Sequence, residues 1–141
     1  MSKLNLPVEE FTTPDPITAD ETASIDDLIF IMKENGIRHL PILKGERVVG
    51  IVSDRDVKVA SGLNAKEKKL IQACDIMAGD PVTVYSQACL DEVALEMSQK
   101  KIGSVIVNDE NEKFLGIFTV TDALNALIEI ARESGKSSKN P

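Results

Sequence analysis

Two short stretches of the sequence place a hydroxyl residue three positions before an aspartate, where an apolar strand meets the start of a helix. They are "GIVSDRDV", with Ser53 and Asp56, and "GIFTVTDAL", with Thr119 and Asp122. This spacing predicts a capping box, in which the hydroxyl accepts a hydrogen bond from the aspartate amide and the carboxylate accepts one from the N-cap amide. A carboxylate at such a turn can also accept both hydroxyls of a ribose, while the free amides and the positive end of the helix favour a phosphate. The two roles are compatible.

The junction occurs twice because nearly the whole chain is a repeat. "FTTPDPIT" is matched by "IMAGDPVT", so that Asp15 corresponds to Asp80 at an offset of 65 positions. The same offset aligns the apolar residues of two helical segments, which are Ile25, Leu28 and Met32 with Leu90, Val93 and Met97. One extra residue in the second hairpin loop raises the offset to 66, which aligns Gly50, Ser53 and Asp56 with Gly116, Thr119 and Asp122. A self-similar chain is expected to build the same unit twice.

Each copy reads as a short strand, a helix, two strands and a second helix. "TASIDDLIFIMKENG" has apolar residues at helical spacing and is expected to end at Gly36. "RHLPIL" and "RVVGIVS" flank a glycine-containing turn, which predicts a hairpin. The predicted organisation is a first repeat with its lead-in over 1–62, a linking helix over 63–74 capped by Asn64 with Glu67, a second repeat over 75–133 and a disordered polar tail over 134–141.

Composition restricts the function classes. A chain of 141 residues with 43% hydrophobic and 28% charged residues is typical of a soluble globular protein. Its net charge of -7 argues against nucleic acid or an anionic membrane surface as a partner. Cys74 and Cys89 lack the spacing of a disulfide framework or a zinc site and suit a reducing cytosol. With no signal peptide or membrane-span pattern, a cytoplasmic protein is expected.

Catalysis has little support in the sequence. It contains no Ser/His/Asp grouping with a plausible base, no phosphate-binding loop, no dinucleotide fingerprint and no metal-ligand cluster. We therefore expect no enzyme activity, no metal and no required cofactor.

The doubled unit, the "DPIT" and "DPVT" openings, the "RHLPIL" strand and the "GIVSDRDV" and "GIFTVTDAL" closings resemble a tandem pair of cystathionine-beta-synthase (CBS) domains, often called a Bateman module. The resemblance covers roughly residues 8–130. It implies an α/β fold of two βαββα repeats packed as a pseudo-twofold disc with two clefts. It also implies a homodimer and an adenosine-containing ligand, such as AMP, ADP, ATP or S-adenosylmethionine.

The resemblance also implies which residues contact that ligand. Apolar residues and the following hydroxyl of each opening strand would flank the adenine, namely Ile17 and Thr18 in one copy and Pro81, Val82 and Thr83 in the other. Thr83 would work with Asp56, and Thr18 with Asp122. Taken singly, Ile17 and Val82 are better explained as core residues, the usual role of an apolar strand residue.

At the positions where a phosphate is expected to sit, only the first copy carries positive charge. Arg38, His39, Arg55 and Lys58 are replaced in the second copy by Gly103, Ser104, Thr121 and Leu124. In the family's geometry Arg38 and His39 approach the centre, and Arg55 lies beside the first cleft. Each arginine is equally explained as a solvated surface charge. His39, with an ordinary pKa near 6.5, is a candidate pH-sensitive group or a structural one.

The expected function is that of a stand-alone regulatory module, in which a bound nucleotide favours one arrangement that an unknown protein partner reads. The main alternative is a ligand-free module for dimerisation or scaffolding, and a minor one is catalysis with the nucleotide as substrate. The apolar residues of "DVKVA" and "DALNALIEIA" exceed what one small sheet covers and favour the homodimer.

Overall fold

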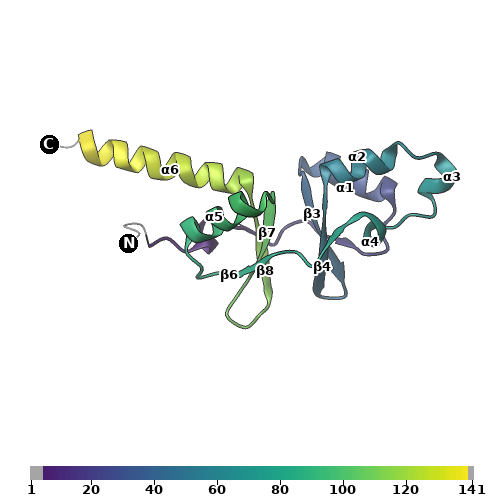
Figure 1. Ribbon diagram of the computed structural model, residues 1–141, viewed down its shortest axis with the longest axis horizontal. Coiled ribbons are helices and arrows are strands. Elements are labelled where there is room, and N and C mark those ends of the chain that lie inside the picture. Colours follow the sequence, from purple (N-terminus) through teal and green to yellow (C-terminus); the bar gives the residue numbers. More distant parts are fainter. Residues whose placement is uncertain (1–4, 140–141) are drawn as a thin grey trace. The chain divides into compact units, whose positions relative to one another are not determined.

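Two four-stranded sheets organise the chain in the computed structural model, which describes residues 5–139 (Figure 1). One sheet has the strand order β2-β3-β4-β5 and belongs to the unit Asp15–Val82. The other has the order β1-β8-β7-β6 and belongs to a unit formed by residues 5–14 and 83–139. Helices accompany both sheets, so the predicted α/β class with two repeated units is confirmed.

The unit Asp15–Val82 contains the first copy of the repeat. Its elements are β2 (Ala19–Asp20), α1 (Ile25–Asn35), β3 (His39–Lys44), β4 (Arg47–Ser53), α2 (Asp54–Ser61), α3 (Ala65–Lys68), α4 (Ala73–Ile76) and β5 (Ala78–Gly79). Helix α1 begins where the Ser24 hydroxyl accepts a hydrogen bond of 3.1 Å from the Asp27 amide, and it ends at Gly36 with a left-handed φ of 59°. The helix end and the hairpin are where the sequence predicts them. Ile25 and Leu28 of α1 are fully buried in the core of this unit.

The linking segment forms two short helices, so the single predicted helix over 63–74 is wrong. The predicted cap is present, since the Asn64 side chain accepts a hydrogen bond of 2.8 Å from the Glu67 amide. Helix α3 ends at Lys68, and by Gln72 the backbone is extended and forms a bridge with Ser24. The Ala73 amide then donates to the Ala23 carbonyl at 2.8 Å, which ties the segment to the first repeat. Tertiary pairing therefore outweighs local helix propensity.

The other unit repeats this plan. Its elements are a short 3-10 helix (Val8–Phe11), β1 (Thr13–Pro14), β6 (Thr83–Tyr85), α5 (Leu90–Lys100), β7 (Ser104–Asn108), β8 (Phe114–Thr119) and α6 (Val120–Lys139). Leu90, Val93 and Met97 of α5 are buried, as their α1 counterparts are. Helix α6 is the long C-terminal helix in Figure 1.

The polar tail predicted over 134–141 is helical through Lys139, and residues 140–141 lie outside the described residues. Extending an existing helix adds a hydrogen bond with each residue, and one glycine such as Gly135 costs only about 1 kcal/mol. The polar composition of this segment therefore does not prevent it from continuing α6.

Each sheet is completed by an edge strand from the segment that leads into the other copy of the repeat. Strand β1, which precedes the first copy, joins the sheet of the second copy, and β5, which precedes the second copy, joins the sheet of the first. Strand β1 pairs antiparallel with β8, where Thr13 lies opposite Ile117, and β5 pairs with β4, where Ala78 lies opposite Ile51. Residues 5–14, predicted to lead into the first repeat, thus belong to the unit of the second. Exchange of this kind depends on pairing between distant segments, which local sequence patterns do not encode.

Glycine permits both exchanged pairings. A Cβ atom at Gly116 would overlap the Thr13 carbonyl oxygen, and one at Gly50 would lie 2.8 Å from the Ala78 carbonyl oxygen. Both approaches are much closer than van der Waals contact allows. The glycines of "GIVS" and "GIFT" are therefore required by the close approach of the exchanged strand.

Candidate ligand-binding site

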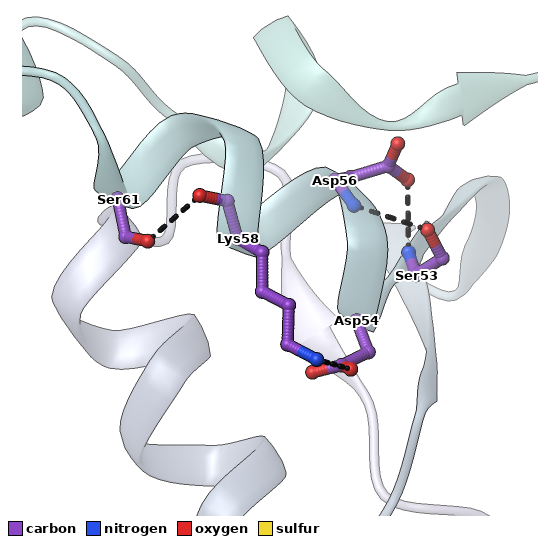
Figure 2. Close-up of polar contacts among 5 residues, drawn as sticks. All are labelled: Ser53, Asp54, Asp56, Lys58 and Ser61. Atoms are coloured by element: carbon purple, nitrogen blue, oxygen red, sulfur yellow. Dashed lines mark hydrogen bonds and ion pairs between the residues drawn. The ribbon is translucent and has the colours of Figure 1, made fainter.

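The carboxylate of Asp56 closes the first strand-to-helix turn and keeps one oxygen available. The Ser53 amide donates to Asp56 Oδ2 at 2.9 Å, and the Asp56 amide donates to Ser53 Oγ at 3.2 Å, which confirms the predicted capping box (Figure 2). Both residues are half-buried. Within the unit Asp15–Val82, no group donates a hydrogen bond to Asp56 Oδ1. This turn therefore offers a fixed carboxylate with an open edge.

The equivalent turn at Asp122 has the same cap and additional donors. The Thr119 amide donates to Asp122 Oδ2 at 2.9 Å, and the Asp122 amide donates to Thr119 Oγ1 at 3.2 Å. The Thr119 hydroxyl also reaches Asp122 Oδ2 at 3.1 Å, and the Thr13 hydroxyl lies 3.2 Å from Oδ1. Both carboxylate oxygens are thus engaged within the protein.

Thr13 is a site residue that the sequence analysis missed. The 65-residue offset aligns it with Ala78, and this difference between the copies was available as a signal. The alignment alone does not indicate a role for Thr13, because its contact with the Asp122 carboxylate, 109 positions away, depends on the pairing of β1 with β8.

The expectation that free helix amides face a phosphate is wrong for two of the three amides in the first turn of α2. The Asp54 amide donates to the Arg38 carbonyl at 2.8 Å, and the Asp56 amide is used in the capping box. The second copy repeats this, since the Val120 amide donates to the Gly103 carbonyl at 3.1 Å. Charged side chains are consequently the main groups that this turn offers to an anion.

Cationic side chains gather around the Asp56 turn. Arg38 and Arg55 are exposed, and neither forms an ion pair with any residue in the described part of the chain. Lys58 is instead paired with Asp54, with 2.9 Å between Nζ and Oδ2 (Figure 2). His39 on β3 lies opposite Ser53 in the sheet register. Arg38 and Arg55 are therefore the cationic side chains at this turn that form no ion pair within the described residues.

Burial lowers the pKa of His39, and the nearby positive charge of Arg38 lowers it further. The carboxylates of Asp54 and Asp56 act in the opposite direction with smaller effect. His39 is therefore neutral at neutral pH and presents a hydrogen-bonding imidazole at this turn.

The second copy has no comparable charge at the matching positions. Ser104, which replaces His39, is buried and lies opposite Thr119, and Thr121, which replaces Arg55, is exposed. At these matching positions the second turn therefore has no cationic side chain, although Arg132 lines the groove beside Asp122.

The residues predicted to flank the base are either exposed or half-buried. Ile17 is 43% exposed, so it is not a core residue, whereas Thr18, Pro81 and Val82 are half-buried. Thr83 is an exposed residue at the start of β6. The pairings of Thr83 with Asp56 and of Thr18 with Asp122 join residues of different units and remain predictions.

A groove of about 560 Å³ lies beside the Asp122 turn, within the unit formed by residues 5–14 and 83–139. Glu10 and Thr13 line it from the lead-in, and Asp122, Glu129 and Arg132 line it from α6. Three carboxylates face one guanidinium, so the groove is acidic. The sequence analysis did not identify it.

The chain belongs to the CBS-domain family, since the family model "CBS domain" matches residues 8–62 and 73–129. A CBS-domain pair of protein MJ0100, in complex with 5'-methylthioadenosine and S-adenosyl-L-methionine, is 28% identical with a TM-score of 0.74, covering 95% of this chain and 99% of that one. CBSX2 in complex with AMP is 25% identical with a TM-score of 0.75, covering 89% of this chain and 98% of that one. The predicted family is confirmed, and these neighbours bind adenosine-containing ligands.

Curated relatives include much longer enzymes. An inosine-5'-monophosphate dehydrogenase of Korarchaeum cryptofilum is 33% identical over 122 residues, which is 86% of this chain and 24% of that protein. A homoserine O-acetyltransferase of Methanosalsum zhilinae is 30% identical over 88% of this chain and 24% of that protein. This chain therefore spans about a quarter of the length of these two curated relatives.

Within the described residues, His, Cys, Asp and Glu side chains form no group of three or more that could hold a metal ion. No helix in residues 5–139 combines the length and apolar character needed to cross a membrane.

Proposed function

We propose that this chain is a regulatory CBS-pair module whose Asp56 turn binds the ribose of an adenosine-containing ligand. The observation that carries the proposal is the Asp56 carboxylate, fixed through Oδ2 by the Ser53 amide and open at Oδ1. A ribose diol needs such an acceptor, because two hydroxyls donating to one carboxylate form charge-assisted hydrogen bonds. Arg38 and Arg55 then supply charge for a phosphate.

Relatives support this ligand class. AMP in CBSX2, and 5'-methylthioadenosine with S-adenosyl-L-methionine in protein MJ0100, share an adenosine moiety. The common part is thus the nucleoside, and the group attached at its 5' position differs. In this chain the unpaired arginines near Asp56 favour a phosphate at that position.

Isothermal titration calorimetry with AMP, adenosine and S-adenosylmethionine tests the proposal. We expect saturable heat with a defined stoichiometry for AMP and weaker binding for adenosine. Silence for all three ligands would contradict the proposal and favour a scaffold without a ligand. The chain is not expected to turn over the bound molecule, so AMP recovered after prolonged incubation should be unchanged by mass spectrometry.

A second role as a homodimer is favoured by exposed apolar side chains on the helices. In the unit Asp15–Val82, Phe30 of α1 is 65% exposed and Val59 of α2 is 74% exposed. In the other unit, Leu124 and Leu127 of α6 are 54% and 61% exposed. We propose that a second copy covers such residues. Light scattering should give twice the monomer mass for the native chain and a smaller mass for Leu127→Glu. A native chain that stays monomeric throughout the micromolar concentration range would contradict the proposal.

A further inference from the structure

Thr13 and Ala78 occupy the same place in the two sheets and differ by a hydroxyl group. Thr13 of β1 lies opposite Ile117 of β8, and Ala78 of β5 lies opposite Ile51 of β4. Ile117 and Ile51 are themselves equivalent positions of the repeat, at an offset of 66. The exchanged strand therefore presents a hydroxyl residue to one turn and a methyl side chain to the other.

This difference changes how much of each carboxylate is available. The Thr13 hydroxyl lies 3.2 Å from Asp122 Oδ1 and 3.4 Å from Oδ2, where the Thr119 groups also donate. Ala78 cannot donate in this way, and within the unit Asp15–Val82 Asp56 accepts a side-chain hydrogen bond from the Ser53 amide alone. A carboxylate offers about four acceptor positions, so each internal donor leaves fewer for a ligand.

We propose that Thr13 makes the two turns unequal by occupying on Asp122 the carboxylate oxygen that a ribose uses on Asp56. A ribose diol at Asp122 has to displace the Thr13 hydroxyl, whereas at Asp56 it meets an open oxygen. Thr13 is thus a residue that determines ligand affinity at the second turn, independently of the phosphate-binding charges near the first. This inference rests on the proposed ribose-binding role of the two aspartates.

The acidic groove acts in the same direction for charged ligands but not for adenosine. Glu10, Glu129 and Asp122 outnumber Arg132 in that groove, so its net negative charge disfavours a phosphate. Adenosine carries no charge at neutral pH, so it separates the hydroxyl effect of Thr13 from this repulsion. It is therefore the ligand for the test.

The test uses Thr13→Val, which removes the hydroxyl and keeps a β-branched side chain, in an Asp56→Ala background where only the second turn can bind. Calorimetry should show adenosine binding about three- to tenfold tighter than in Asp56→Ala alone, the range expected for one internal hydrogen bond removed. The exchange variant Ala78→Thr, made in an Asp122→Ala background, should weaken binding at Asp56 by a similar factor. Thr13→Val in the same Asp122→Ala background should leave adenosine affinity unchanged.

Two outcomes overturn the inference in different ways. If the native chain binds adenosine but Thr13→Val leaves the affinity of the Asp56→Ala protein unchanged or weakens it, Thr13 does not restrict the second turn. In that case the ribose role of Asp56 stands. If the native chain binds neither adenosine nor AMP, the proposed function fails and this inference fails with it.

Discussion

Replacing Asp56 with alanine removes the ligand-facing carboxylate and one half of the capping box. Losing the hydrogen bonds from a ribose diol to a charged acceptor should cost about 1.5 to 3 kcal/mol, which is roughly a ten- to hundredfold weaker dissociation constant. The lost hydrogen bond from the Ser53 amide, 2.9 Å long in the native chain, should separately lower the free energy of unfolding by about 1 kcal/mol. Binding and folding effects must therefore be measured on the same protein.

The assay is calorimetric titration with AMP at a temperature well below the unfolding midpoint, with thermal unfolding recorded without ligand. Asp122→Ala is the matched control, because it removes the equivalent carboxylate and the equivalent cap bond from Thr119. It should lower the unfolding temperature at least as much, because Asp122 also accepts hydrogen bonds from the Thr119 and Thr13 hydroxyls. It should leave the tighter AMP-binding event in place.

The reasoning fails if Asp122→Ala abolishes AMP binding while Asp56→Ala does not. That result would mean that the cationic side chains of the first copy serve the second turn. An equal loss in both variants would show instead that the two turns contribute to one shared ligand.

Three further outcomes are expected. Arg55→Ala should weaken AMP binding about three- to thirtyfold and leave adenosine binding unchanged in calorimetry, because it removes a charge from the phosphate and nothing from the ribose. The pKa of His39 is lowered in the folded chain, so the unfolded chain takes up a proton first. The stability that neutral His39 contributes is therefore complete above pH 6.5 and is lost as the pH falls below that value. The unfolding temperature of His39→Gln should accordingly depend less on pH between 7.5 and 5.5 than that of the native chain. Gly116→Ala should lower the free energy of unfolding in urea by about 1 to 3 kcal/mol because its Cβ would overlap the Thr13 carbonyl, whereas Gly79→Ala, with nothing within 4 Å of the added atom, should have little effect.

Local features of this chain follow from its sequence. The capping boxes at Ser53 and Thr119 and the end of α1 at Gly36 involve residues a few positions apart, and hydrogen bonds over such short separations are readable from residue type and spacing. The repeat placed equivalent apolar residues in both cores, as the burial of Leu28 and Val93 confirms. The difference in charge at matching positions of the two copies follows from aligning the repeats.

The tertiary structure alone decided which segments meet. Strand β1 crosses to β8, and the Thr13 hydroxyl thereby reaches Asp122, a contact between residues 109 positions apart that no local pattern specifies. The bridge between Ser24 and Gln72 likewise divides the predicted linking helix. The hydrogen bond from the Asp54 amide to the Arg38 carbonyl also joins residues that are not neighbours in the sequence. In each case a backbone or side-chain group is satisfied by a distant partner, and the energy of that pairing depends on how the whole chain folds.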